Sequence, residues 1–328
     1  MEDAIIRLKR NDNFIYIKNN KELDDETDLL RIKKLRIPPA WNKVFIAQDE
    51  DNYMQVIGKD EANRTQYIYH KSWIKQQERD KFIRLIYFSK NIKFIRKDLR
   101  AILKEPEWNR NKLIAFIINI IDECGLRIGN EKYQKLYDSF GITTLLKKHV
   151  IIKNNEVLLD FIGKKKVENT CILKKPLNIR LFKSLYKQFN HSCDDQFFVY
   201  MYKDRKKILD NKSINNYIKD FGDFTIKDFR TFRANTDLIK LLYNQEIEET
   251  KTGLKRTLNY CLDKIADKLN NTRTVLKNKY ICSFLLEKYL EDPVLFIKNI
   301  RKYKSKPLKD NDQFESALIY YLSKYKRM

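Results

Sequence analysis

Residues 113–121 read Leu-Ile-Ala-Phe-Ile-Ile-Asn-Ile-Ile, a segment in which Asn119 is the single polar residue. A helix formed by this segment is apolar on nearly all sides, and such a helix is stable where other elements cover it from every direction. We therefore expect it at the centre of a hydrophobic core. The chain can supply that cover, since it has 328 residues, of which 43% are hydrophobic.

Helical periodicity continues on both sides of this segment. Upstream, from Asp80 onwards, apolar residues recur at helical spacing: Phe82, Leu85, Ile86, Phe94, Ile95, Leu99, Ile102 and Leu103. Downstream, the same spacing predicts helices over about 177–189, 213–220, 226–243, 254–269 and 272–291, and residues 283–328 also look helical. Glycine (7) and proline (6) are scarce, which favours long helices with few tight turns.

Two parts of the chain have the composition and the turn residues of β-strands instead. Residues 149–153, 156–162 and 167–173 form one patch, joined by turns at 154–155 and 163–166. Residues 44–46, 54–58 and 66–69 belong to the other, a region of short strands and polar turns from 1 to about 75. We predict an α+β fold: a small β-rich N-terminal domain at 1–76, then a mainly α-helical domain at 77–328 that carries a three-stranded β-hairpin sheet.

The charge balance indicates a polyanionic partner. Lys and Arg number 67 against 44 Asp and Glu, a formal net charge of +23, and the excess is spread along the chain rather than confined to a tail. Basic side chains gain affinity for nucleic acid by displacing counterions from phosphates. A lysine-rich solvated surface encoded by an AT-rich genome is the alternative interpretation of the same numbers.

Cysteine and histidine usage argues against a metal site. The five cysteines lie far apart without a CxxC pair, and we expect buried, reduced thiols at Cys124, Cys171, Cys193, Cys261 and Cys282. Three histidines leave little material for zinc, so we expect no metal and no cofactor. No apolar run approaches the ~18 residues of a membrane span. The N-terminus, MEDAIIRLKRND, lacks the uninterrupted apolar stretch typical of a signal peptide, so we expect a soluble intracellular protein.

Four short segments hold residues suited to chemistry on a phosphate. They are GLRIGNEKY at 125–133, GKKK at 163–166, TIKDFRTF at 225–232, and LNNT at 269–272 just ahead of KYI at 279–281. In this order and spacing they resemble the Arg–Lys–Arg–His/Asn–Tyr set of type IB DNA topoisomerases, in particular the small poxvirus-like and bacterial forms. RIPPAW at 36–41, RTQYIYHKSW at 64–73 and RDKF at 79–82 resemble the amino-terminal clamp domain of that family. The resemblance therefore runs from about residue 36 to Tyr280.

The resemblance implies an enzyme that relaxes supercoiled DNA without metal or ATP. Tyr280 would attack a phosphodiester and form a 3′-phosphotyrosyl intermediate, which stores the bond energy until religation. Arg127 and Arg230 would hold the extra negative charge of the pentavalent phosphorane, for which the planar guanidinium fork is suited. A phenol ionises near pH ~10, so neighbouring positive charge is needed to favour its phenolate.

Two further residues complete the set, and each has an alternative interpretation. Lys164, at a hairpin tip, would be the general acid that protonates the leaving 5′-oxygen; without the other motifs it is one of three solvated lysines on a turn. Asn271, nine residues before the tyrosine, would donate a hydrogen bond to a non-bridging oxygen. A turn or N-cap residue before the next helix is the alternative interpretation of Asn271, and both roles can hold at once. Arg233, one turn after Arg230, is a competing choice of arginine.

The same resemblance implies a set of DNA contacts. Gln66, Tyr67 and Tyr69 would meet the major groove from the clamp domain, and Lys132 and Tyr133 would contact DNA beside the first catalytic arginine. Gln pairs with adenine edges and Lys with guanine, so some sequence preference follows. Because the two clamp tyrosines share one strand face, packing within a small sheet is the alternative. The implied partner is double-stranded DNA, bound by a monomer that encircles the duplex, with no membrane involved.

Two other classes of protein are compatible with parts of this pattern. A tyrosine recombinase or integrase shares the catalytic fold but usually carries HxLR where this chain has KDFR at 227–230, and a helical domain where this chain is β-rich. A non-catalytic DNA-binding protein of the same fold should have lost at least one of the main catalytic residues. All four are present here: Arg127, Lys164, Arg230 and Tyr280. An amino-acid composition typical of an AT-rich genome, together with the small size of the protein, fits a large DNA virus as the source. That source would place the protein in the virion or at a cytoplasmic site of DNA replication, and a cellular source would place it with the chromosome.

Overall fold

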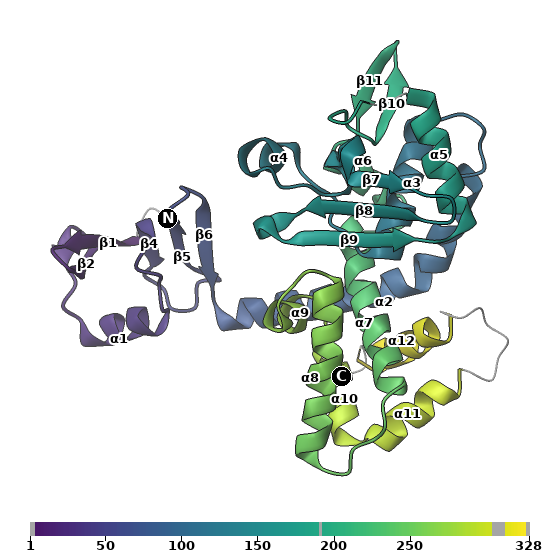
Figure 1. Cartoon of the computed structure of the whole chain (residues 1–328). Helices are drawn as coiled ribbons and strands as arrows, with labels where there is room; N and C mark the ends of the chain where they lie inside the picture. The colour runs from purple at the N-terminus through teal and green to yellow at the C-terminus, as the bar shows by residue number, and fades with distance from the viewer. Residues whose placement is uncertain (1–3, 190–191, 304–311, 326–328) are drawn as a thin grey trace. The chain divides into compact units, whose positions relative to one another are not determined.

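The computed structural model describes residues 4–189, 192–303 and 312–325, and it has the α+β architecture predicted from the sequence (Figure 1). Strands dominate the N-terminal region, and helices follow that are interrupted by a three-stranded sheet. Contacts divide the chain into two compact units, Met1–Lys81 and Phe82–Met328, each with its own hydrophobic core. Within the described ranges, every helix is too short or too polar to cross a membrane.

The described part of the first unit contains a six-stranded antiparallel sheet, the helix α1 (Glu26–Lys34) and the beginning of α2 (Lys71–Ile102). The strand order is β3-β2-β1-β4-β5-β6, and the core contains Ile5, Val44, Ile46 and Val56, each at most 1% exposed. The strands are β1 (Ala4–Arg10), β2 (Asn13–Lys18), β3 (Lys21–Glu22), β4 (Asn42–Ala47), β5 (Met54–Lys59) and β6 (Thr65–Tyr69). The last three contain the strands predicted at 44–46, 54–58 and 66–69, whereas the first three lie where the sequence predicts no individual strand.

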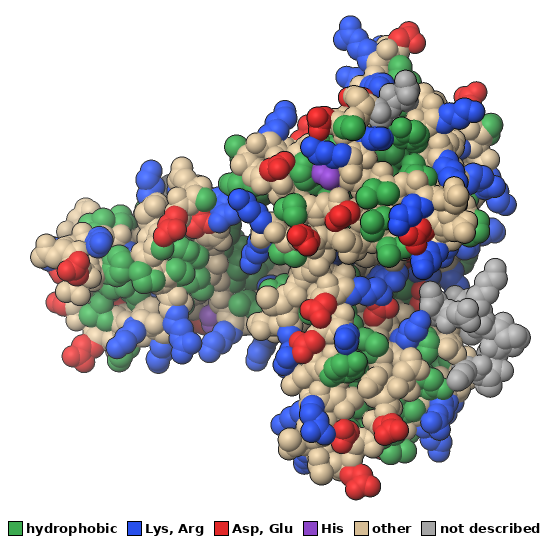
Figure 2. Space-filling model, in the orientation of Figure 1, with side chains coloured by type: hydrophobic (Ala, Val, Ile, Leu, Met, Phe, Trp, Pro, Cys, Tyr) green, Lys and Arg blue, Asp and Glu red, His purple; other side chains and the backbone are tan. Residues whose placement is uncertain are grey.

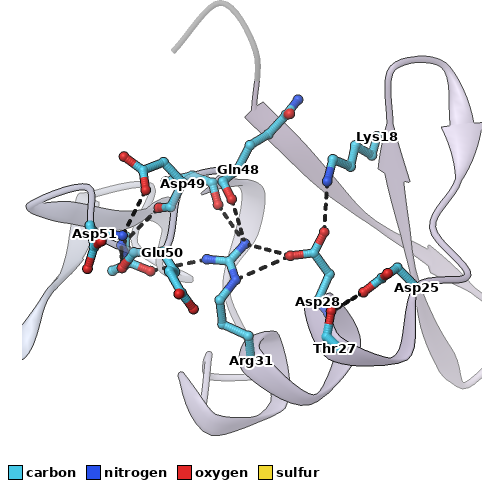
Figure 3. Close-up of polar contacts among 11 residues, drawn as sticks. Lys18, Asp25, Thr27, Asp28, Arg31, Gln48, Asp49, Glu50 and Asp51 are labelled. Atoms are coloured by element: carbon cyan, nitrogen blue, oxygen red, sulfur yellow. Dashed lines mark hydrogen bonds and ion pairs between the residues drawn. The ribbon is translucent and has the colours of Figure 1, made fainter.

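Arg31 fastens α1 to the sheet through a set of polar contacts (Figure 3). Its guanidinium donates to the carbonyl of Ala47 at the end of β4 over 2.9 Å, and it pairs with Asp28 at 3.3 Å. Asp28 also accepts from Lys18 Nζ, at the end of β2, over 2.8 Å. Asp25 caps the helix by accepting from the backbone N–H of Asp28 over 2.8 Å. Helix α1 is therefore bound to strands that lie on either side of β1.

The second unit is built around α3 (Arg110–Cys124), which confirms the central helix predicted from residues 113–121. Residues Leu113, Ala115, Phe116 and Ile117 are fully buried, and the helix packs against α6, α7, β9 and β10. The three-stranded sheet β7 (Val150–Ile152), β8 (Val157–Ile162) and β9 (Glu168–Leu173) confirms the predicted patch. The other helices up to residue 268 are α2 (Lys71–Ile102), α4 (Glu131–Tyr137), α5 (Pro176–Phe189), α6 (Asn211–Lys219), α7 (Ile226–Tyr243) and α8 (Lys251–Lys268). An unpredicted hairpin, β10 (Val199–Tyr202) and β11 (Arg205–Ile208), lies between α5 and α6 in the chain.

The C-terminal helices complete the core of this unit. Helix α11 (Pro293–Arg301) packs on α7 and on α12 (Asp312–Tyr325), and α12 also packs on α7. Arg96 of α2 holds α12 to α3, because its guanidinium meets Asp122 at 2.7 and 3.0 Å and Glu315 at 2.8 and 2.9 Å. Glu315 is only 4% exposed, so this ion-pair network is largely shielded from water.

The single helix predicted at 272–291 is wrong. The structure has two helices, α9 (Arg273–Lys279) and α10 (Ser283–Glu291), separated by Tyr280–Cys282. Asn235 of α7 accounts for the break, because its side-chain amide donates to the carbonyl of Tyr280 and accepts from the N–H of Cys282, both over 2.8 Å. Backbone groups paired with a buried side chain have no need of helical partners. The N-cap of α9 is Thr272 rather than Asn271.

The expectation of five buried, reduced cysteines is also wrong. Cys124, the last residue of α3, and Cys171 of β9 form a disulfide, with Cα atoms 6.0 Å apart. Cys193 is exposed, while Cys261 and Cys282 are buried. The spacing of these cysteines in the sequence carries no sign of the pair, because α3 and β9 become neighbours only when the sheet packs on the helix. The disulfide joins the end of α3 to the sheet that carries the Lys164 turn.

Candidate active site

The loop after α3 presents Arg127. The helix ends at Gly125, whose φ of 66° is left-handed, a conformation that glycine adopts without strain. Past this turn, the Arg127 Nη2 atom donates to Asn271 Oδ1 over 2.7 Å and to the carbonyl of Asn270 over 3.2 Å. Two of the predicted site residues, one after α3 and the other before α9, are therefore in direct contact.

Arg230 is almost completely buried in the first turns of α7, with 5% of its surface exposed. Its Nη1 donates to the carbonyl of Gly125, and its Nη2 donates to the carbonyl of Leu269 over 2.9 Å. These carbonyls lie at the C-terminal ends of α3 and α8, where unpaired acceptors and the helix dipole favour a cation. Burial lowers the pKa of Arg230 to about 10, against an opposing attraction to Tyr280. The guanidinium is thus fixed in orientation before any substrate binds.

Tyr280 follows α9, and its ring lies beside two cations. The ring centroid is 5.5 Å from Arg230 Cζ and 5.8 Å from Lys227 Nζ, residues three apart on one face of α7. Burial raises the pKa of Tyr280, but the positive charges of Arg230, Arg127 and Lys227 lower it by more, so the pKa lies below its usual value. The surroundings of Tyr280 therefore favour the phenolate, which is the nucleophilic form of the side chain.

Two donors of this cluster, Arg230 Nε and Asn271 Nδ2, are buried without a hydrogen-bond partner in the part of the chain that the structure describes. A buried N–H without a partner costs about 1–3 kcal/mol, so such groups in a folded protein call for a bound acceptor. With Arg127 and Lys227 nearby, an anion such as a phosphate is the acceptor that suits them. Across residues 4–189, 192–303 and 312–325, no group of three His, Cys, Asp or Glu side chains is placed to hold a metal ion.

Lys164 is not brought into contact with the other four residues. It is exposed in the turn Lys164–Lys166 between β8 and β9, and it makes no hydrogen bond or ion pair with any described residue. The connection to the cluster runs through Asn169 at the base of the turn, which accepts from Asn270 Nδ2 over 2.7 Å. Arg233, the alternative arginine, donates instead to the carbonyl of Asp122 over 2.8 Å and lies 3.7 Å from Asp237.

The five predicted DNA contacts are divided between the two units, and all have accessible surface. In the first unit, the rings of Tyr67 and Tyr69 stack at 5.9 Å with 47% and 37% exposed, and Gln66 donates to Asp60 over 2.9 Å. In the second, Lys132 and Tyr133 are exposed on α4. Figure 2 shows basic side chains over both units on the face drawn, with acidic ones among them.

The structure adds Lys227, Asn235 and Asn169 to the surroundings of the site, and the sequence predicts none of them as a site residue. Lys227 carries a usable signal, because a residue three positions before Arg230 on a helix lies on the same face. The other two carry none. Asn235 acts on a residue 45 positions away and Asn169 on one 101 positions away, so only folding reveals their partners.

Comparison with known proteins identifies the class to which this fold and site belong. Residues 70–314 match the family described as "Eukaryotic DNA topoisomerase I, catalytic core", and residues 13–60 match "Bacterial DNA topoisomerase IB, N-terminal domain". The protein is therefore an isomerase of the DNA topoisomerase I class.

The relatives narrow this class further. The DNA topoisomerase 1B of Acanthamoeba polyphaga mimivirus is 33% identical over 309 residues, which cover 90% of each chain. The DNA topoisomerase 1B of vaccinia virus (strain Copenhagen) is 27% identical over 290 residues, covering 86% of this chain and 87% of the viral one. The chain belongs to the type IB DNA topoisomerase family.

Proposed function

We propose that this protein relaxes supercoiled duplex DNA by cutting one strand with Tyr280, allowing that strand to rotate about the intact one, and rejoining it. The observation that carries the proposal is the setting of Tyr280: a buried phenol beside Arg230 and Lys227, with its pKa lowered. Adjacent positive charge favours the phenolate, the form in which a tyrosine attacks phosphorus, and perturbed pKa values of this kind cluster at functional sites.

Cleavage exchanges one phosphate ester for another. The Tyr280 phenol loses its proton to solvent, its oxygen bonds to phosphorus, and the bond between phosphorus and the 5′-oxygen breaks. Lys164 gives a proton to that 5′-oxygen, which leaves as a hydroxyl. Religation reverses each step, with Lys164 taking the proton back from the attacking hydroxyl. Because one ester bond is made for each one broken, and superhelical strain drives the rotation, the reaction needs no ATP.

Arg127, Arg230 and Asn271 hold the negative charge that develops on the non-bridging oxygens. The support is the pair of buried donors without partners, Arg230 Nε and Asn271 Nδ2, which a phosphate oxygen would satisfy. Asn271 has no titratable proton, so its part is electrostatic. Since charged side chains take the role that a divalent cation plays elsewhere, we expect activity without added metal.

Residues 1–76 are proposed to act as a clamp, so that a monomer encircles the duplex during cleavage. Gln66, Tyr67 and Tyr69 would read the major groove from this domain, and Lys132 and Tyr133 would bind DNA from α4. The exposed surfaces of these side chains support the assignment. If the source is a virus, as for the mimivirus and vaccinia relatives, the protein would act in the virion or at a cytoplasmic replication site.

Relaxation of supercoiled plasmid in EDTA without ATP tests the proposal. The wild type should relax the plasmid, Tyr280→Phe should bind it without relaxing it, and the exposed Tyr260→Phe should behave as the wild type. Failure of the wild type to relax any plasmid that it binds would contradict topoisomerase activity in favour of a recombinase or a non-catalytic DNA-binding protein. Activity in Tyr280→Phe would show that another residue is the nucleophile.

A further inference from the structure

An amide–amide bridge links the Lys164 turn to the loop that holds Arg127. Asn270 Nδ2 donates to Asn169 Oδ1 over 2.7 Å, between residues 101 positions apart in the sequence. Asn169 lies on β9 and is 5% exposed, so water competes little for its amide. At the other end of that amide, Asn169 Nδ2 donates to the carbonyl of Val167 over 2.8 Å. A single side chain thus bonds to two separate parts of the site.

The base of the Lys164–Lys166 turn is shaped around this amide. The carbonyl of Val167 also accepts from the backbone N–H of Gly163 over 2.8 Å, which closes the turn. A Cβ atom on Gly163 would lie 2.3 Å from Asn169 Nδ2, closer than such atoms approach. The φ of Gly163 is −103°, which any residue can adopt. The buried amide, rather than the backbone conformation, therefore explains why a glycine precedes Lys164.

The far end of the bridge reaches the residues that orient Arg127. Asn270 has a left-handed φ of 49°, and its carbonyl accepts from Arg127 Nη2 over 3.2 Å. The next residue, Asn271, accepts from the same nitrogen over 2.7 Å. A shift of Asn270 would move both acceptors of Arg127 together. The turn with the proton donor and the loop with the phosphate-binding groups are thus connected through one hydrogen bond.

We propose that Asn169 is a positioning residue for strand cleavage. It fixes the position of the Lys164 turn relative to Asn270 and Asn271, so that the proton donor and the phosphate-binding groups act on the same phosphate. This inference rests on the proposed function, in which Lys164 protonates the leaving 5′-oxygen. Asn169 bonds to protein groups on both sides and acts through Lys164.

Two variants remove the bridge from opposite ends. Asn169→Ala deletes the acceptor, and Asn270→Gly deletes the donor while glycine still adopts the left-handed φ and keeps the carbonyl. Single-turnover cleavage of an oligonucleotide duplex should slow on the order of 10²-fold in each, the usual effect of misplacing a catalytic group by about 1 Å. The double variant should be no slower than the slower single variant, because both remove the same bond. Thr170→Ala, the exposed neighbour on β9, is the matched control and should cleave at the wild-type rate.

A duplex with sulfur in place of the 5′-bridging oxygen separates positioning from a general loss of structure. A thiolate leaves without protonation, so its departure does not need Lys164. Lys164→Ala and Asn169→Ala should therefore both regain most of the lost rate on this substrate.

Each other outcome overturns a defined part of the argument. An equal loss on both substrates in Asn169→Ala, with recovery in Lys164→Ala, overturns the inference and leaves the proposed function standing. No recovery in Lys164→Ala removes this lysine as the acid, which overturns the inference and the protonation step of the proposed mechanism, while strand cleavage by Tyr280 stands. A wild-type rate of Asn169→Ala on the ordinary duplex overturns the inference alone.

Discussion

Replacing Arg230 by lysine and by glutamine separates the geometry of this side chain from its charge. Lysine keeps the charge but has a single ammonium group, whereas glutamine keeps a planar polar group and loses the charge. In the structure, the two terminal nitrogens of Arg230 donate to the carbonyls of Gly125 and Leu269, and Nε is buried without a hydrogen-bond partner among the described residues. Glutamine has two N–H donors for these two carbonyls and a phosphate oxygen, and lysine would have to reach all three acceptors from a single nitrogen.

The expected losses follow from those contacts. Removing one preorganised donor to a developing oxyanion lowers the rate by about 10²–10³, equivalent to about 2.7–4 kcal/mol. One carbonyl left without a partner costs about 1–3 kcal/mol of the free energy of unfolding. A protein with the usual stability of about 5–15 kcal/mol stays folded after that loss. In both variants, the rate of cleavage should therefore decrease far more than the fraction of folded protein.

The pH dependence distinguishes the two variants. Burial raises the pKa of Tyr280, and the charge of Arg230 is the largest effect that lowers it. Glutamine removes that charge, so the pKa of Tyr280 rises and the rate increase that accompanies phenolate formation moves to higher pH. Lysine retains the charge, so the pH at which the cleavage rate increases should change little, while the rate itself should be lower at every pH.

Single-turnover cleavage of an oligonucleotide duplex, followed from acid to alkaline pH, measures both effects. Arg233→Lys is the matched control, because Arg233 lies one turn further along α7 and bonds to Asp122 instead. A rate for Arg230→Lys within tenfold of the wild type would refute the argument from donor geometry. The same displacement of the pH profile in both variants would refute the argument from charge.

Three further predictions concern the folded structure. Arg96→Ala removes the cation that pairs with the buried Glu315 and the partly buried Asp122, and it should lower the free energy of unfolding in urea by about 3–5 kcal/mol. The exposed Lys97→Ala should not. Cys171→Ser removes a disulfide with a sequence separation of 47, so it should lower the free energy of unfolding by about 4 kcal/mol relative to the oxidised wild type. Cys193→Ser, the control, should have little effect. Reductant should lower the free energy of unfolding of the wild type but not that of Cys171→Ser. Gly125→Ala places a side chain on a residue with a φ of 66°, so it should lower the free energy of unfolding, measured by thermal unfolding, by at least about 1–2 kcal/mol. Cleavage should also slow, because the carbonyl of this residue accepts from Arg230.

The elements that the sequence predicts well are those with local causes. The apolar segment at 113–121 requires a central helix, and the alternation and turns at 149–173 require a small sheet, because neither depends on which partner packs against it. The break at Tyr280 has a different origin. It depends on Asn235, which belongs to another helix and takes over the backbone hydrogen bonds on either side of residue 281. No local pattern distinguishes such a broken helix from a continuous one.

The candidate site also contains features that the sequence predicts and features that depend on which elements pack together. Order and spacing of the motifs, through the family resemblance, predict Arg127, Lys164, Arg230, Asn271 and Tyr280 as one set, and the structure brings the side chains of all but Lys164 together. The disulfide between Cys124 and Cys171 has no counterpart in the spacing, since it depends on the packing of β9 against α3. The roles of the predicted residues in catalysis stay predictions, because proximity establishes which groups can act together and only kinetics establishes which do.

The arrangement of helix ends explains how several like charges share this site before DNA binds. Gly125, Leu269 and Tyr280 are the C-terminal caps of α3, α8 and α9, so three helices end around the same place. Each end leaves carbonyls without helical partners and carries a partial negative charge. Arg230 takes up two of these carbonyls, which offsets part of its burial and its repulsion from Arg127. The helix ends thereby hold the cations in place while Arg230 Nε and Asn271 Nδ2 stay unpaired, so a phosphate oxygen would complete an arrangement that is already ordered.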